Sequence, residues 1–344
     1  MENSSINKPV AVIILNWNGD ELLQTFLPAV LFNTNTDIAD VFVADNGSTD
    51  NSLHLLKTQF AGRIKLIQFS RNYGFAEGYN RAIKQCAGYQ YTVLLNSDVE
   101  PEIGWIEKLY QFMERHPDTG ACQPKILSFH DKNSFEYAGA CGGFIDKHGY
   151  PYCRGRIFGT CEKDYGQYDK EMNIFWASGA ALMVRTELYN AAGGLDPLFF
   201  AHMEEIDLCW RIRLAGYEIS VVPEACVYHL GGGSLPAENP KKTYLNFRNN
   251  LLMLHKNLPD NDRGPILFRR RLLDTLAFFK YVATLDLANA KAIVKAHMDF
   301  KKMRKNYTIH PSINILPESP GGNTDILYQY YLRRIHFYSH LPQT

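Results

Sequence analysis

Residues 10–50 read VAVIILNWNGDELLQTFLPAVLFNTNTDIADVFVADNGSTD, and this stretch decides the fold. It begins with the apolar run VAVIILN, continues with a helical pattern from about Gly19 to Asn33, and ends in a second apolar run, VFVADN. Strands that alternate with helices form βαβ units, in which the strands are parallel and the crossover is right-handed. Strands that are apolar at almost every position are typical of a sheet covered by helices on both faces. The stretch therefore predicts an open, mostly parallel α/β sheet.

The same alternation continues toward residue 115. Further helices are expected from Asp50 to Phe60, around Glu77 to Ala87 and from Ile103 to Arg115, and the strands IKLIQF and YTVLLN lie between them. Residues 118–175 have no clear period, and we expect antiparallel strands there and a loop that shapes the site.

Regular patterns return after residue 175. One helix should end at Gly193 and Gly194 and another at Gly216, because glycine favours the backbone conformation that ends a helix. The run EISVVPEACVYH is expected to be a pair of strands, and long helices follow from Pro240 onward.

Four polar strings stand where strand-like or apolar runs end. Because ligands of an open α/β sheet bind beyond the carboxyl ends of its strands, these strings should converge on one site, which we expect to hold a nucleotide and a metal ion. The strings are Asn16-Trp17-Asn18-Gly19, Asp45-Asn46-Gly47-Ser48-Thr49-Asp50, Asn96-Ser97-Asp98 and Glu204-Glu205-Ile206-Asp207. Asp45 is expected in a connecting turn, free to face a ligand.

Asp98 and His229 are the candidate metal ligands. Asp98 follows a buried strand, and Mg²⁺ or Mn²⁺ is often held by one or two carboxylates together with substrate phosphates. An imidazole such as that of His229 can complete the coordination of Mn²⁺. Asn96 can bond a ribose or a phosphate.

Glu204 and Glu205 are the candidate general bases. They stand at the start of a predicted helix behind Phe199 and Phe200, and a carboxylate in a partly apolar site can have a raised pKa and accept a proton from a hydroxyl. Asp207 is explained by the helix dipole alone.

Composition excludes several classes of protein. Lys and Arg together number 36, as do Asp and Glu, so no overall positive charge attracts nucleic acid. The seven cysteines form no C-x-x-C pair, which argues against a zinc ribbon, and buried, reduced thiols are expected. The N-terminal residues lack the pattern of a secretory signal, and no run approaches about 18 apolar residues, so we expect a cytoplasmic protein.

The C-terminal part, residues 241–344, is expected to be a helical extension of a domain formed by residues 1–240. Between Arg263 and Lys305 it has eleven Lys or Arg and three Asp, a local net charge of +8. Leu272, Leu276 and Phe279 share one helix face. This basic amphipathic segment either lies on the inner face of the plasma membrane as a peripheral contact or packs on the first domain; we favour the membrane.

Seven segments occur in the order in which family 2 glycosyltransferases carry them. The chain resembles this family, and in particular its rhamnosyltransferase-like branch, across about residues 9 to 235, roughly two thirds of its length. The resemblance implies a GT-A fold, a Rossmann-like, mostly parallel sheet flanked by helices, and inverting, metal-dependent transfer from a nucleotide diphosphate sugar. The segments are LNWNG, VADNGSTDNS, RNYGFAEGYNRAI, VLLNSDVEP, ASGAALMVR, GGLDPLFFAHMEEIDLCWRIRLAGY and VPEACVYHLGGGS.

The resemblance also implies a role for each matching residue. Asp98 stands in the family's D-x-D-type string, where Asn96 replaces the first Asp, and His229 matches the metal-side histidine. Glu205 occupies the position of the usual base, an Asp, so the choice between Glu204 and Glu205 stays open. The remaining positions are the base or ribose contacts Asn16 and Asp45 with Gly47 beside them, the nucleotide-sugar pocket residues Asn72, Gly74, Gly78 and Asn80, and the acceptor-side residues Trp176, Ser178 and Gly179.

The predicted reaction is a single displacement that transfers a sugar to a hydroxyl of a glycan or of a lipid-linked oligosaccharide, as in bacterial surface polysaccharide synthesis. The branch favours dTDP-rhamnose as donor, and UDP- and GDP-sugars remain alternatives. A nicotinamide enzyme is disfavoured because no G-x-G-x-x-G follows the first strand. A nucleotidyltransferase and a degenerate, glycan-binding family member are the other candidates.

Overall fold

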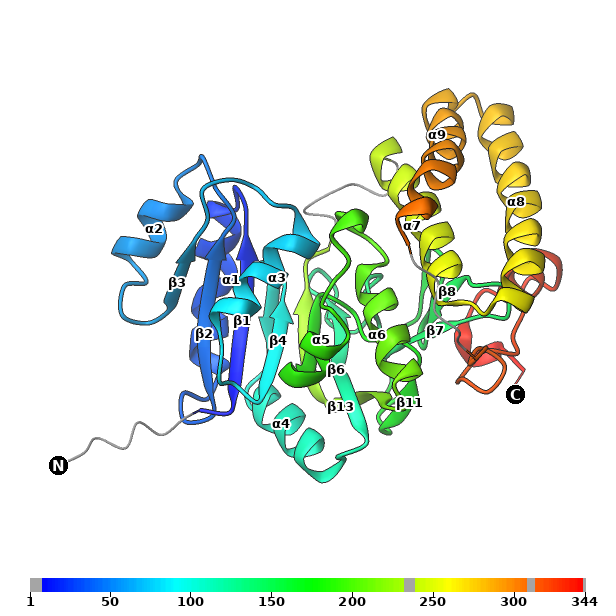
Figure 1. Ribbon diagram of the computed structural model, residues 1–344. Helices are drawn as coiled ribbons and strands as arrows, with labels where there is room; N and C mark the ends of the chain where they lie inside the picture. The colour runs from blue at the N-terminus through cyan, green and yellow to red at the C-terminus, as the bar shows by residue number, and fades with distance from the viewer. Residues whose placement is uncertain (1–7, 232–238, 308–312, 343–344) are drawn as a thin grey trace.

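The central sheet of this computed structural model extends across most of the molecule, and the last helices lie at one end of it (Figure 1). The structure describes residues 8–231, 239–307 and 313–342. In these ranges the sheet has nine strands in the order β11-β13-β6-β12-β4-β1-β2-β3, and β5 pairs with β13. The strands are β1 (Val10–Asn16), β2 (Ala39–Asp45), β3 (Lys65–Gln68), β4 (Tyr91–Leu95), β5 (Val99–Pro101), β6 (Thr119–Ser128), β11 (Met172–Ile174), β12 (Ala181–Arg185) and β13 (Glu218–His229).

Most strands of this sheet run in one direction. The pairs β1/β2, β2/β3, β1/β4 and β6/β13 are parallel, while β12 is antiparallel to both β4 and β6. Strands β1 to β4, β6 and β13 therefore share a direction, and β5, β11 and β12 oppose it. The expected α/β fold with a mostly parallel sheet is confirmed.

Helices cover both faces of the sheet, as the continuous apolar strands predicted. Val10, Val12 and Ile14 of β1 pack with α1, α2 and α4, whereas Ala11 and Ile13 pack with α3 and α6 on the other face. All five side chains are almost fully buried. The helices of this part are α1 (Asp20–Asn33), α2 (Ser52–Thr58), α3 (Phe75–Gln85), α4 (Trp105–Arg115), α5 (Thr186–Ala191), the short 3-10 helix η1 (Pro197–Phe199) and α6 (Glu204–Leu214).

The run EISVVPEACVYH is one strand, β13, so the predicted pair of strands is wrong. Its pairing with β6 shifts register between Val222 and Cys226. Pro223 lies in this interval and has no N–H to donate to a ladder, so the chain forms a bulge there and then resumes the same strand.

Residues 118–175 contain β6 and a small antiparallel sheet. The antiparallel strands expected there are confirmed, but β6 itself, which runs through the middle of the central sheet, was not recognised. The small sheet consists of β7 (Gly143–Ile145), β8 (Pro151–Cys153), β9 (Arg156–Ile157) and β10 (Thr160–Cys161).

The C-terminal helices differ in how deeply they are buried. Helix α7 packs on α6 and α9, whereas α8 buries only Leu267, Arg270 and Asp274. Leu276 of α8 is 65% exposed, and Phe268, Leu272 and Phe279 are also exposed. No helix in the described part of the chain is apolar over a length that would cross a membrane. The elements are α7 (Pro240–Asn257), α8 (Asp260–Ala283), α9 (Leu287–Met303), η2 (Arg304–Asn306), the π-helical turn η3 (Tyr328–Leu332) and η4 (Tyr338–His340).

Candidate active site

A cavity of about 1010 Å³ lies between the carboxyl ends of the central strands and the C-terminal helices. One wall is formed by Asn96 and Asp98 after β4, Glu204 and Glu205 at the start of α6, and His229 at the end of β13. The opposite wall comes from α7, α8 and η3. Two of the four polar strings thus converge as expected, and the other two contribute no residue to the lining.

Asp98 and His229 lie together in this cavity. The Nε2 atom of His229 is 3.1 Å from Oδ1 of Asp98 and 3.3 Å from the side-chain nitrogen of Asn96. On the other side of the ring, Nδ1 is 3.0 Å from Oε2 of Glu136. Burial alone lowers the pKa of His229, but hydrogen bonds to Asp98 and Glu136 outweigh it and raise the pKa to about 10. Burial raises the pKa of Asp98, but His229 lowers it more, so the net shift is downward.

The donor set of this corner fits a divalent ion that is shared with a substrate. A carboxylate and an imidazole face each other, and Glu136 on the far side of the ring is the type of partner that orients metal-binding histidines. In residues 8–231, 239–307 and 313–342 no three His, Cys, Asp or Glu side chains are arranged to hold a metal by themselves. Phosphate oxygens of a ligand would have to complete the coordination.

Glu136 was not found from the sequence. It lies in the irregular part of residues 118–175, after β6, and no local pattern marks it. A signal exists at Gly231, which has a φ of +68° and where a Cβ would lie 2.6 Å from a carboxylate oxygen of Glu136. This glycine leaves room for Glu136 beside His229. The adjoining residues 232–234 of the glycine run lie outside the described residues.

Glu204 is buried and Glu205 is half-buried at the first turn of α6. Each has one carboxylate oxygen that is buried and has no hydrogen-bond partner in the part of the chain that the structure describes. Burial raises the pKa of Glu205 to about 7. Burial and then the charge of Glu205 raise the pKa of Glu204 well above its usual value. The pair can therefore exchange a proton near neutral pH.

The loop before these carboxylates has an uncommon backbone. Phe200, His202 and Met203 have φ values of +66°, +69° and +73°, a region that residues other than glycine rarely occupy. Asn249 of α7 holds this loop, because its amide nitrogen donates to the carbonyls of Phe199, Ala201 and His202 at 2.9, 2.8 and 2.7 Å. The neighbouring Arg248 donates to the carbonyl of Phe199 as well.

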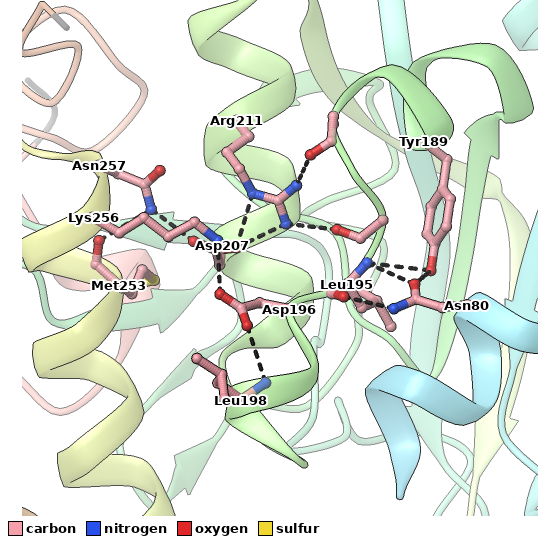
Figure 2. Close-up of polar contacts among 12 residues, drawn as sticks. Asn80, Tyr189, Leu195, Asp196, Leu198, Asp207, Arg211, Met253, Lys256 and Asn257 are labelled. Atoms are coloured by element: carbon pink, nitrogen blue, oxygen red, sulfur yellow. Dashed lines mark hydrogen bonds and ion pairs between the residues drawn. The ribbon is translucent and has the colours of Figure 1, made fainter. Parts of the chain in front are cut away.

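Asp207 links α6 to α7 a little further along (Figure 2). Its fully buried carboxylate is 2.7 Å from Nη2 of Arg211 and 2.9 Å from Nζ of Lys256, and it accepts a hydrogen bond of 2.8 Å from Asn257. Burial raises the pKa of Asp207, but Arg211 and Lys256 lower it more. The explanation by the helix dipole alone is therefore wrong: Asp207 is the centre of a buried ion pair between two helices.

Asn16 and Asp45 form a closed pair at the ends of β1 and β2. Asp45 is fully buried, and it accepts hydrogen bonds from the side chain of Asn16 at 3.2 Å and from the N–H of Ser48 at 3.1 Å. The expectation that Asp45 is free to face a ligand is therefore wrong. Gly47 follows with a φ of +74°, and a Cβ there would lie 2.5 Å from the backbone of Arg71.

The loop at residues 71–80 is also built from internal contacts. Asn72 accepts a hydrogen bond of 2.7 Å from the N–H of Gly74. Side chains at Gly74 and Gly78 would meet Phe200 and Leu15 at 2.8 Å. Asn80 bonds Tyr189 and both backbone groups of Leu195 (Figure 2). None of Asn72, Gly74, Gly78 and Asn80 lines the cavity.

The three predicted acceptor-side residues do line the cavity. Trp176 is buried and donates from Nε1 to the carbonyl of Phe144 at 3.0 Å. Ser178 accepts a hydrogen bond from the N–H of Ala180 at 3.2 Å. Gly179 packs beside Glu205, where an added Cβ would lie 3.7 Å from the Cβ of Glu205. These residues thus adjoin the carboxylate pair.

Solved glycosyltransferase structures have the same fold. The chain resembles a mannosyltransferase, PcManGT, from Pyrobaculum calidifontis, with a TM-score of 0.52 and 14% identity over 86% of this chain and 84% of that chain. It also resembles GalNAc-T7, with a TM-score of 0.55 and 15% identity over 74% of this chain. That match covers only 48% of the GalNAc-T7 chain, so this chain spans about half of it. The fold is GT-A-like, as expected.

The sequence comparisons agree with the resemblance. Over residues 11–178 the chain matches the family model described as Glycosyl transferase family 2. It is 28% identical over 235 residues to N-acetylglucosaminyl-diphospho-decaprenol L-rhamnosyltransferase of Mycobacterium tuberculosis, which covers 63% of this chain and 75% of that protein. It is 23% identical over 231 residues to the O-antigen biosynthesis protein RfbC of Myxococcus xanthus, a match that covers 67% of this chain and 18% of that protein.

Proposed function

We propose that this protein is an inverting, metal-dependent glycosyltransferase that moves a sugar from a nucleotide diphosphate sugar to an acceptor hydroxyl. The observation that carries this proposal is the cavity in which two carboxylates of raised pKa share the walls with Asp98 and His229. A base that is half ionised near pH 7 suits removal of a hydroxyl proton at that pH.

Glu205 is proposed as the base and Glu204 as its protonated neighbour, because burial and the charge of Glu205 raise the pKa of Glu204. Glu205 removes the proton of the acceptor hydroxyl while the hydroxyl oxygen attacks the anomeric carbon from the face opposite the diphosphate. The new bond forms as the bond to the diphosphate breaks, which inverts the configuration at that carbon. Asp98 and His229 would hold Mg²⁺ or Mn²⁺, which when bound neutralises negative charge on the diphosphate.

The proposed donor follows from the relatives. The similarity to an L-rhamnosyltransferase of M. tuberculosis supports dTDP-rhamnose as the proposed donor. The similarity to the solved structures of GalNAc-T7 with UDP and Mn²⁺ and of PcManGT with GDP-Man and Mn²⁺ keeps UDP- and GDP-sugars as alternatives. Both structures contain Mn²⁺, which supports a divalent ion in the proposed reaction. Asn16, Asp45 and the loops at Gly47 and Asn72 are proposed to support the nucleotide.

The proposed acceptor is a glycan or a lipid-linked oligosaccharide in bacterial surface polysaccharide synthesis. The M. tuberculosis relative is named for a lipid diphosphate acceptor, and RfbC is named for O-antigen biosynthesis. The exposed apolar and basic face of α8 supports peripheral contact with the inner face of the plasma membrane. In the proposed division, residues 1–240 form the catalytic domain and residues 241–344 the helical extension.

Thermal stability with a panel of dTDP-, UDP- and GDP-sugars, with and without Mn²⁺ or Mg²⁺, tests the donor and the metal. We expect one nucleotide class to raise the melting temperature only with metal, and we expect Asp98→Ala to lose this effect. No response of the wild type to any donor would argue for a degenerate, glycan-binding protein. Release of diphosphate instead of nucleoside diphosphate would argue for a nucleotidyltransferase.

Sugar transfer by the wild type and two variants tests the base. Glu205→Gln should reduce turnover by about 10²- to 10⁴-fold and keep metal-dependent nucleotide binding. Glu204→Gln is the matched control and should lose less. Full turnover in Glu205→Gln would show that the base is assigned wrongly.

A further inference from the structure

Arg156 is a buried cation in the wall of the cavity that has no carboxylate partner. It lies on β9 and is only 6% exposed. Its Nη2 atom is 2.9 Å from the sulfur of Cys153, its Nη1 donates to the carbonyl of Phe158 at 3.3 Å, and its Nε is buried without a partner. In the described ranges no Asp or Glu lies within ion-pair distance of it. Burying a charge without a counter-charge is costly, so such a group suggests an anionic ligand.

Lys242 is a second cation on the same wall. It belongs to the first turn of α7, is half-buried, and forms no ion pair within the described residues. Burial lowers its pKa, and the charge of Glu136 offsets this only in part. The ring of Tyr137 is near both cations, with its centroid 4.7 Å from the guanidinium carbon of Arg156 and 5.4 Å from Nζ of Lys242. Two unpaired cations beside one ring repel each other until an anion binds between them.

Apolar side chains also line the cavity. Phe158, two residues after Arg156, packs against Tyr330 and Tyr331 of η3 with ring centroids 4.9 and 5.8 Å apart. Leu276 of α8 and Leu332 of η3 line the same cavity and are 65% and 74% exposed. The cavity that contains Arg156 therefore also offers exposed apolar side chains to a ligand. Strand β8 and helices α7 and α8 lie at the opposite end of the molecule from β1 to β3 (Figure 1).

We propose that Arg156 and Lys242 bind the phosphate groups of the acceptor, and that the acceptor is a sugar joined through a phosphate or diphosphate to an apolar chain lying along Phe158, Leu276 and Leu332. The inference rests on the proposed function and deepens it. The cavity walls supply carboxylates, cations and apolar side chains, which suit the hydroxyl, the phosphate and the lipid of such a molecule. The donor is the other source of a diphosphate, but its nucleotide strings belong to β1 and β2 at the other end of the sheet.

Titration with farnesyl diphosphate, farnesol and inorganic diphosphate tests the proposal on the full chain. Wild type should bind farnesyl diphosphate more tightly than either part alone. Lys242→Gln and Arg156→Gln should each weaken that binding by about ten- to a hundredfold, because hydrogen bonds to charged groups are lost. Lys241→Gln is the matched control, because Lys241 is the exposed neighbour and does not line the cavity.

A parallel titration with dTDP or UDP and Mn²⁺ separates the two sources of phosphate. Nucleotide affinity should stay within about twofold in both variants. Lys242 forms no ion pair within the described residues, so its replacement should not disturb the fold. Unchanged binding of farnesyl diphosphate in Lys242→Gln would therefore overturn the proposal. Equal weakening of nucleotide binding would assign the cations to the donor and overturn it too. If the wild type binds no nucleotide, the proposed function is contradicted. The proposal for Arg156 and Lys242 is tested separately, because the farnesyl diphosphate titration measures binding at these two residues without a nucleotide.

Discussion

The region around β1 and β2 and the region around the cavity are built in different ways. Around β1 and β2, predicted residues stand at the ends of the strands or in the turns after them, and they bond to one another, as Asn16 does with Asp45. Around the cavity, neighbouring groups come from segments far apart in sequence, such as Glu136, Arg156, Asn249 and Leu276. Local motifs therefore define the first region, and only the folded chain defines the second.

Helix α7 shows what this difference means for the C-terminal part. It carries no family motif, yet Asn249 bonds three carbonyls of the loop before Glu204, and Lys256 pairs with Asp207 of α6. The carboxylates proposed for catalysis are thus held in place by the extension. Each of the next three experiments compares a residue with a matched control residue.

The largest expected effect is on stability, in Asp207→Asn. This change leaves Arg211 without a carboxylate partner and leaves Lys256 with Asp196 alone, and it should cost about 3–5 kcal/mol of unfolding free energy. Glu77→Gln in α3 is the control, because Glu77 pairs with Arg81 at the same i,i+4 spacing but on the surface, where a pair contributes about 0–1 kcal/mol. Denaturant unfolding measures both. Equal losses would show that the α6–α7 ion pair is no more important than a surface pair.

The next largest effect is expected in the turn after β2, for Gly47→Ala. Both Gly47 and Gly62 have positive φ values, +74° and +75°, but a Cβ at Gly47 would lie 2.5 Å from the backbone of Arg71, whereas nothing lies within 4 Å of one at Gly62. Gly62→Ala should cost about 1–2 kcal/mol from backbone strain alone. Gly47→Ala should cost about 1–3 kcal/mol more from the clash. Comparable melting temperatures for the two variants would contradict this account of the turn.

A smaller loss of stability is expected for Asn249→Ala, about 1–3 kcal/mol, because the carbonyls of Ala201 and His202 lose their donor. The positive φ values before Glu204 should then relax, so turnover should fall while metal-dependent nucleotide binding is kept. Asn261→Ala on the exposed face of α8 is the control and should change neither. Normal turnover in Asn249→Ala would show that α7 does not position the carboxylates.

The same comparison explains how much the sequence could predict. Apolar periodicity predicted the α/β sheet and the motif-bearing helices, because these patterns are local. It split β13 into two strands, because Pro223 resembles a break but is absorbed by a bulge. It also left Asp45 free, because a sequence does not show that Asn16 and Ser48 bond it.

The rest of the site depends on tertiary contacts. Glu136 and Arg156 lie in a region without a regular period, and their importance appears only from their distance to His229 and from their burial. The role of α8 also could not be predicted from local sequence. Its apolar stripe could be read as a packing face or as a membrane face, and the fold settles only that the described residues leave Leu272, Leu276 and Phe279 exposed.

The smallest expected effect is the change in turnover for each pH unit, which depends on the ionisation of Glu205. Burial raises the pKa of Glu205 to about 7, and the base acts in its ionised form, so turnover should rise with pH and level off above about 7. Below that value it should fall about tenfold per pH unit, equivalent to about 1.4 kcal/mol.

The folded-state pKa of Glu205 lies above the unfolded value of 4.5, so the stabilising contribution of the protonated carboxyl is complete below pH 4.5 and is lost as pH rises through about 7. Glu205→Gln should therefore remove the rise in turnover and, measured by unfolding, gain stability over the wild type at pH 8 relative to pH 5. A stability difference that does not change between these pH values would show that Glu205 is not the group that titrates.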